Sequence, residues 1–348
     1  MPAIAVGLAV VATVRSGQPR RVAEVKGEVI SGPVGTEGWV AWIEGDEQGC
    51  RLRAARGGGR PMLAAPALSG LAVAGETAFL TRAEGPETEL LKVSLRSGST
   101  ERIAALTGPA AQMVAGGEWL CWREHRPAGL PGVPFVAAGA PINVIRARKQ
   151  AGGQVSLVTP VTGAVELVGV RGDDLYWVER YGEGPGASTL IRRARLPHGE
   201  PETLVTEKGW RTAALAEDAR HTFGGQALVW TAPSAEGAAP EQFCAVKRQA
   251  LGGAETVLAH PEVAGDWLDP RASLLVSQQG IYVQDRYHLW RLGRERSDQR
   301  AVYPVPSALT SSSLVGDEQY LVLGGPGRQV VAVRAVGFWG RVRRGLAR

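Results

Sequence analysis

Short apolar runs alternate with turn residues along most of this chain. One six-residue pattern recurs seven times: a turn residue, usually Gly, then two mostly polar or small residues, then three strand-forming residues. Its sixth position falls at residues 42, 80, 122, 177, 230, 283 and 321, so successive copies lie 38 to 55 residues apart. A propeller blade of four strands needs about 40–45 residues plus any loop insertions. The pattern therefore predicts one copy per blade.

Each copy has strand-like neighbours on both sides. An alternating strand follows it, as at 90–95, 144–148, 190–194 and 330–334. A further strand comes after a short Gly or Pro turn, as at 61–63, 101–103, 202–205 and 255–258. A strand of small residues precedes the copy, as at 69–73, 112–114 and 311–315, and small side chains suit the crowded axis of a propeller. We therefore predict an all-β fold: a single β-propeller of about seven four-stranded blades.

The two chain ends are expected to close the ring together. The last blade, after Val302, lacks an outer strand, and residues 20–24 supply the missing pattern, which removes an open sheet edge. Residues 11–25 also align with 92–106, so residues about 5–15 resemble a third strand. Either two N-terminal strands close the ring and residues 329–334 are spare, or the apolar start is a truncated anchor. We favour the closing strands, with the propeller at 1–335.

The net charge and the two termini indicate which partners this chain is expected to bind. The net charge is +5, and much of the excess lies after Val333, so the body of the chain is near neutral and no nucleic-acid partner is expected. The basic C-terminal tail, residues 336–348, is predicted to be a solvated end or an amphipathic segment that contacts a membrane surface. Residues 2–14 are apolar, but they are too short for a membrane helix and lack the positive start of a signal peptide.

Candidate chemistry is sparse. Cys50, Cys121 and Cys244 form no CxxC pair, and an odd number excludes a full disulfide framework, so buried free thiols are expected. None of the five histidines pairs at metal-ligand spacing, and no nucleophile elbow or phosphate-binding loop is present. We predict no catalytic residue, no metal and no cofactor, and we lean against an enzyme.

The tryptophans at 42, 122, 177 and 230 occupy one register of the repeat. Large aromatic side chains at a single register of successive blades are typical of packing between blades. We expect them in the core rather than at a binding site.

The blade pattern resembles the YWTD and TolB-like propeller repeats. Gly172-Asp173-Asp174-Leu175-Tyr176-Trp177 carries the turn and aromatic pair, and 191–196 with 201–205 carry the second half of the signature. Residues 228–230, 246–253 and 255–258 repeat it. The resemblance implies the propeller fold and a binding or scaffold module, mostly extracytoplasmic in related proteins. It implies no catalytic residues to carry over.

Long loops point to a recognition face. Segments 123–142, 180–188 and 231–241, and the crossover 206–222, belong to blades three to five and should open on one face, where extended loops on a rigid scaffold usually bind ligands. The candidate binding residues are Trp210, Arg211, Tyr181, Arg180, Phe135, His125 and Arg126. Arg and aromatic side chains dominate binding hot spots.

The leading hypothesis is a monomeric, non-catalytic binding or scaffold propeller that recognises a protein or polymer partner through this face. The alternative is a propeller enzyme, a lyase or hydrolase, with its site at the mouth of the central channel. Asp266, Asp269 and Arg271 are the channel candidates, because they precede an inner strand of the sixth blade.

Overall fold

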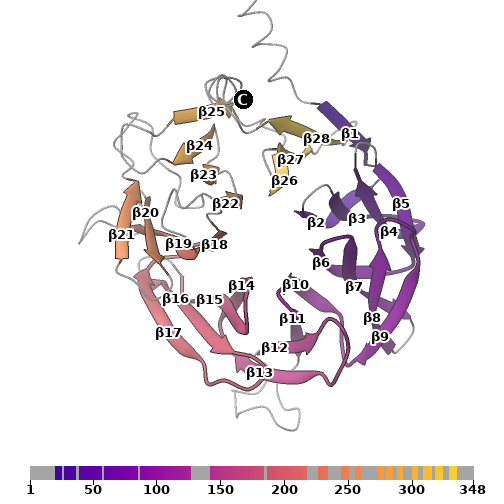
Figure 1. Ribbon diagram of the computed structural model, residues 1–348, viewed down its shortest axis with the longest axis horizontal. Helices are drawn as coiled ribbons and strands as arrows, with labels where there is room; N and C mark the ends of the chain where they lie inside the picture. The colour runs from indigo at the N-terminus through magenta and orange to yellow at the C-terminus, as the bar shows by residue number, and fades with distance from the viewer. Residues whose placement is uncertain are drawn as a thin grey trace, which may run out of the picture.

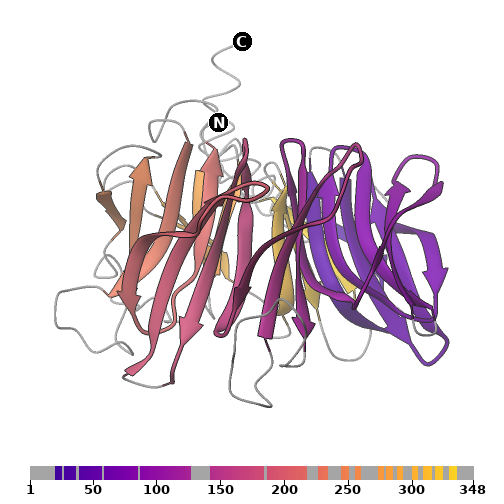
Figure 2. The same cartoon turned by 90° about the horizontal axis from the view of Figure 1, so that it is seen from below.

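Seven four-stranded antiparallel sheets stand around a central axis, as Figure 1 shows down that axis and Figure 2 from the side. The structure, a computed structural model, describes residues 20–334 apart from 26, 37–38, 57–58, 85–86, 127–141, 184–185, 218–225, 234–243, 251–254, 260–272, 278–279, 285–287, 293–299, 305–308, 316–317 and 324–328. Within these residues there is no α-helix, and so no helix that could cross a membrane. The predicted all-β propeller is confirmed.

In blades 1 to 6 the strands run in sequence order from the axis outward. Blade 1 contains β2 (Glu28–Thr36), β3 (Trp39–Asp46), β4 (Gly49–Ala55) and β5 (Gly59–Ala65). Blade 2 contains β6 (Leu68–Ala74), β7 (Thr77–Glu84), β8 (Glu87–Ser94) and β9 (Thr100–Leu106). Blade 3 contains β10 (Ala110–Gly116), β11 (Trp119–Arg126), β12 (Ile142–Lys149) and β13 (Ser156–Val161).

The second half of the ring repeats this order. Blade 4 contains β14 (Ala164–Arg171), β15 (Asp174–Tyr181), β16 (Ser188–Arg195) and β17 (Glu202–Lys208). Blade 5 contains β18 (Ala213–Glu217), β19 (Gln226–Pro233), β20 (Cys244–Ala250) and β21 (Glu255–Ala259). Blade 6 contains β22 (Ser273–Ser277), β23 (Gly280–Gln284), β24 (His288–Leu292) and β25 (Arg300–Pro304).

Blade 7 joins the two ends of the chain. It consists of β26 (Leu309–Val315), β27 (Glu318–Leu323), β28 (Gln329–Arg334) and, outermost, β1 (Arg20–Glu24). β1 pairs antiparallel with β28, and the inner strand β26 lies beside β2 of blade 1, so the ring is closed. The favoured interpretation, in which two N-terminal strands close the ring and 329–334 are spare, is wrong, because 329–334 form the third strand and, of the described strands, β1 alone is added outside it. Residues 5–15 and the tail 336–348 lie outside the described residues.

The turn residue of the repeat has a conformational role. Gly75, Gly117 and Gly172 stand in the hairpin between the inner and second strands of blades 2, 3 and 4, and each has φ of 55°. This left-handed conformation is costly for residues with a Cβ atom. The recurrence of Gly at the first pattern position thus follows from hairpin geometry.

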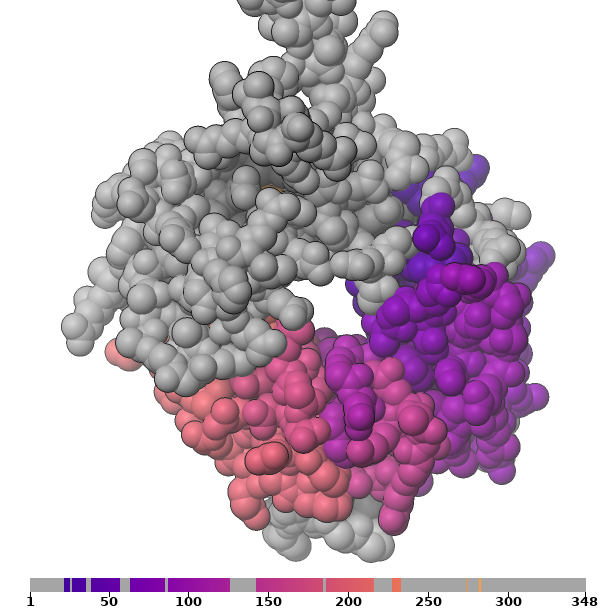
Figure 3. Space-filling model, in the orientation of Figure 1, coloured from indigo at the N-terminus to yellow at the C-terminus, as the bar shows by residue number. Residues whose placement is uncertain are grey.

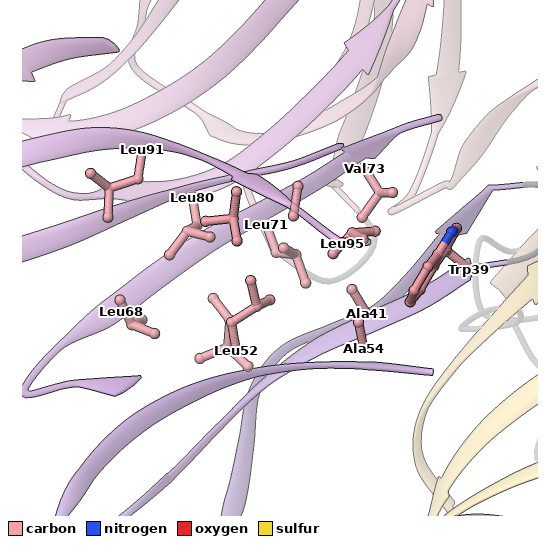
Figure 4. Packing of buried hydrophobic residues seen from close by; sticks show 13 residues of the cluster. Trp39, Ala41, Leu52, Ala54, Leu68, Leu71, Val73, Leu80, Leu91 and Leu95 are labelled. Atoms are coloured by element: carbon pink, nitrogen blue, oxygen red, sulfur yellow. The ribbon is translucent and has the colours of Figure 1, made fainter. Parts of the chain in front are cut away.

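Packing between blades forms the core. Trp42, Trp122, Trp177 and Trp230 are all 0% exposed. Each lies in a cluster with residues of the preceding blade: Trp42 with Val22 of β1, for example, and Trp230 with Tyr176 of β15. Figure 4 shows the corresponding cluster between blades 1 and 2, which is built mainly of leucine, alanine and valine. The predicted inter-blade role of the tryptophans is confirmed.

We expect ring closure to depend on side chains of β1. Val22 is buried against Trp42, so Val22→Ala should lower the free energy of unfolding by about 2 kcal/mol through lost burial and the cavity left behind. Urea denaturation measures this change. Glu28→Gln, at an exposed position on β2, is the control and should have little effect. Equal stability of Val22→Ala and wild type would contradict the assigned closure.

Candidate functional site

The long connections emerge on one face of the ring. In a blade of four antiparallel strands, the connection from second to third strand lies on the same face as the crossover to the next blade. We call this the crossover face. On it stand the connections 127–141, 182–187 and 234–243 of blades 3, 4 and 5. Their extra length is confirmed, although the strands extend further into each segment than expected.

The crossover from blade 4 to blade 5 is shorter than predicted. We expected 206–222, but β17 runs to Lys208 and β18 begins at Ala213. The crossover is therefore 209–212. The sequence of β18, Ala-Ala-Leu-Ala-Glu, is the small-residue pattern of an inner strand, so these residues belong to blade 5 and not to the crossover. Trp210 and Arg211 consequently stand on a tight, braced connection.

A repeated buried ion pair underlies this face. In blade 4 the carboxylate of Glu179, 0% exposed, accepts from Trp177 Nε1 at 2.7 Å and from Arg192 Nη1 at 3.2 Å. The same Trp–Glu–Arg triad recurs in blades 1 and 3, with Trp donating to the carboxylate two residues later and Arg coming from the third strand. These triads are Trp42–Glu44–Arg53 and Trp122–Glu124–Arg146.

The triads are built into the core rather than poised for catalysis. Each buried carboxylate is occupied by donors of the protein itself; Glu124 also accepts from Thr107 Oγ1 at 3.3 Å. A carboxylate whose oxygens already accept several hydrogen bonds from the protein has little capacity left to bind a substrate group. We did not predict this arrangement, although the spacing Trp-x-Glu is visible in the sequence at 42–44, 122–124 and 177–179.

Removing one triad carboxylate should be costly. In Glu124→Ala the guanidinium of Arg146 and the indole N–H of Trp122 lose their partner, and breaking such a buried pair costs about 3–5 kcal/mol. Urea denaturation tests this prediction. The control Glu118→Ala removes a carboxylate of the same blade that pairs with Lys149 in an exposed position, and it should change stability little. Similar losses in both variants would contradict a special role for the triad.

Trp210 is the one aromatic side chain among the described residues that is both large and exposed, at 53%. Its indole Nε1 donates to the carbonyl of Gly182 at 3.0 Å, which ties the crossover 209–212 to the connection 182–187. Tyr181, the residue before Gly182, donates its hydroxyl proton to Glu179 Oε2 at 2.6 Å. Burial and this hydrogen bond raise the pKa of Tyr181 to about 12. The phenol therefore stays protonated.

Arg211 differs from the expectation, because it is only 1% exposed. Its backbone N–H donates to Thr189 Oγ1 at 3.0 Å, and its Nε donates to the carbonyl of Lys208 at 2.8 Å. Arg180 donates to the Arg211 carbonyl at 2.9 Å and forms an ion pair with Glu166. Arg180 and Arg211 thus hold the crossover under Trp210, and Arg211 does not project from the surface.

His125 lies on the seam between blades 3 and 4. It is exposed near the end of β11, directly opposite Asn143 of β12. Asn143 Nδ2 donates to the carbonyl of Gly163 at 2.8 Å. A Cβ atom on Gly163 would come within 2.9 Å of the Tyr181 ring, so the Tyr181 ring lies against this glycine. A chain of contacts thus links His125 through Asn143, Gly163, Tyr181 and Gly182 to Trp210, and we call this set of residues the blade 3–5 surface.

The side chains of the other predicted residues are not described. The backbone of Arg126 pairs with Ile142 at the end of β11, and its side chain lies outside the described residues. Phe135, Asp266, Asp269 and Arg271 lie outside them as well. Figure 3 shows an opening at the axis beside the inner strands of blades 2 to 4.

Metal and thiol chemistry find little support in the described part of the chain. It contains no group of three or more His, Cys, Asp or Glu side chains that could hold a metal ion. Cys121 is a buried free thiol, and its burial raises its pKa far above the ordinary range, so it stays protonated and unreactive. Cys50 is free and half-buried, whereas the side chain of Cys244 is not described.

Comparison with solved structures identifies the same fold at low sequence identity. The acylaminoacyl peptidase of Pyrococcus horikoshii matches 96% of this chain with a TM-score of 0.61 and 8% identity. An oligogalacturonate lyase in complex with manganese matches 91% of this chain and 96% of its own, with a TM-score of 0.59 and 9% identity. The chain spans 55% of the length of the peptidase. At these identities the likeness shows the propeller fold alone.

A third structure differs in how its ring is described. The β-propeller domain of the Trilobed protease from Pyrococcus furiosus matches 90% of this chain and 96% of its own, with a TM-score of 0.58 and 9% identity, and is said to have an open velcro topology. Here β1 closes the last blade by pairing with β28. No protein-family model matches the sequence, and no curated protein matches it.

The pKa of His125 should depend on the charge of its neighbour Arg123. Partial desolvation lowers the pKa of His125, and the positive charge of Arg123 lowers it further. Arg123→Gln should therefore raise the pKa of His125, while leaving it below its ordinary value because the partial desolvation remains. Titration of the ¹³C-labelled imidazole followed by NMR measures this. Arg96→Gln, on the opposite face, is the control; an unchanged His125 pKa in Arg123→Gln would refute the coupling.

Proposed function

We propose that this chain is a non-catalytic binding or scaffold propeller, and that a protein or polymer partner docks on the blade 3–5 surface with Trp210 as its anchor. The resemblance of the repeats to YWTD and TolB-like propellers supports this proposal, because related propellers are mostly binding or scaffold modules. The observation that carries the proposal is Trp210 itself, which is half-exposed yet fixed through Nε1 to Gly182.

A fixed and exposed indole is a favourable binding element. Ordering a mobile side chain on binding costs free energy. The Trp210 side chain is already held by its hydrogen bond to Gly182, and its crossover by the bond from Arg211 N–H to Thr189, so little of this cost remains. Tryptophan is enriched among the residues that dominate binding energy. The charged groups beneath it are satisfied by the protein: Arg180 by Glu166 and the Arg211 carbonyl, and Glu179 by its triad. This supports recognition rather than chemistry.

Substituting Trp210 tests the proposal. An affinity pull-down from native lysate, quantified by mass spectrometry, would compare wild type with Trp210→Ala, and the captured partner would then be titrated with each protein. We expect the variant to bind about 30-fold more weakly or worse, because loss of a hot-spot tryptophan costs about 2 kcal/mol or more. The side chain is exposed, so folding should be unaffected, which a denaturation curve checks.

The matched control is Leu157→Ala. Leu157 is an exposed apolar residue, 41% accessible, on the outer strand β13 and away from the crossover face. Equal capture by Trp210→Ala and Leu157→Ala would place the binding surface elsewhere. If no protein captures a partner, the alternative gains: a propeller enzyme, lyase or hydrolase, with its site at the channel mouth. Asp266→Asn and Asp269→Asn would then be the variants to assay.

A further inference from the structure

Trp210 presents the flat face of its indole to solvent and no free polar atom. The residue is 53% exposed, whereas its one polar side-chain atom, Nε1, donates to the carbonyl of Gly182 at 3.0 Å. Gly182 has φ of 69°, a conformation that favours a residue without a side chain, so no side chain at this position stands beside the indole. A ligand can therefore pack on the ring face, but it cannot accept a hydrogen bond from the indole N–H.

The charged groups around the crossover 209–212 favour a neutral ligand. Arg180, which donates to the carbonyl of Arg211, forms an ion pair with Glu166. Arg211 is 1% exposed and cannot reach a ligand. The exposed charges on the two segments that the indole joins are of opposite sign, Lys208 before the crossover and Glu183 in the connection 182–187. Neither an anion nor a cation therefore finds an unbalanced charge beside the ring.

Two classes of neutral ligand pack well on an aromatic face: the proline ring of a peptide and the pyranose ring of a sugar. Proline-rich segments dock in grooves that several aromatic side chains line. In the described part of the chain Trp210 is the one large aromatic residue that is exposed, so it forms a platform rather than a groove. A pyranose needs only one such platform, because the C–H groups of one sugar face lie on the electron-rich indole while its hydroxyl groups stay hydrated.

We propose that Trp210 is a stacking platform for one pyranose ring of a neutral polysaccharide. The proposal rests on the proposed function and narrows its partner from a protein or polymer to this class of polymer. The indole binds the sugar ring by apolar contact, and its bond to Gly182 holds it in place before the ligand arrives. Since every ring along the polymer can occupy the platform, a polysaccharide is retained better than a monosaccharide of the same sugar.

The test titrates the full chain with neutral hexasaccharides: maltohexaose, cellohexaose, mannohexaose and xylohexaose. Binding is followed by the NMR signal of the Trp210 Nε1–H, which is assigned by its absence from Trp210→Phe. We expect a saturable shift with at least one of these probes, and the same affinity in high salt, because the contact is not ionic. A shift with none of them, or an affinity that high salt abolishes, would overturn the proposal.

Variants of the platform separate stacking from other effects, with calorimetry as the measure of affinity. Trp210→Ala should weaken binding of the same hexasaccharide about tenfold or more, because the apolar contact area is lost. Trp210→Phe keeps an aromatic face and should bind more tightly than Trp210→Ala but less tightly than wild type. Leu157→Ala, the control, should bind normally. Equal affinity of Trp210→Ala and wild type would contradict the platform.

A decaproline peptide tests the other class of neutral ligand. If it shifts the Trp210 signal and binds more tightly than every hexasaccharide, the assignment to a saccharide is overturned. Failure of all the hexasaccharides, with Trp210-dependent capture from lysate retained, would reject the sugar class alone. Loss of Trp210-dependent capture as well would reject the proposed function.

Discussion

Packing of each blade against its predecessor is the interaction on which the rest of the structure depends. A tryptophan on the second strand of blades 1, 3, 4 and 5 is completely buried against the blade before it. In blades 1, 3 and 4 the carboxylate two residues later accepts hydrogen bonds from the indole N–H and from an arginine of the third strand. This combination buries a large apolar surface and fixes its orientation, because a buried carboxylate is tolerated only where its donors are in place.

The packing between blades also fixes the position of residues in the blade 3–5 surface. Glu179 belongs to the blade 4 triad and also accepts from Tyr181, so the core of the blade positions a residue of the crossover face. Gly163 and Gly182 link Tyr181 to the neighbouring blades on either side. A ligand on this face would therefore meet a rigid arrangement, although the connections that carry it are not regular strands.

The polar groups of the blade 3–5 surface divide into two kinds. Arg180, Arg211 and Glu166 satisfy one another and brace the crossover below Trp210. Arg123 and the Asn143 oxygen are partly or wholly buried without full satisfaction, which is uncommon in folded proteins.

The sequence by itself determined the number of blades, the order of their strands and the burial of the tryptophans, because alternation, turn glycines and repeat spacing are local properties that a four-stranded blade imposes on its own residues. It also predicted which connections between strands are long. Only the tertiary structure decided that Trp210 is exposed while the adjacent Arg211 is buried, that 213–217 is a strand, and that 329–334 rather than 5–15 takes the third position of blade 7. These outcomes depend on which segments pair and on the side chains that pack around the crossover. The alternation of apolar and polar residues encodes neither.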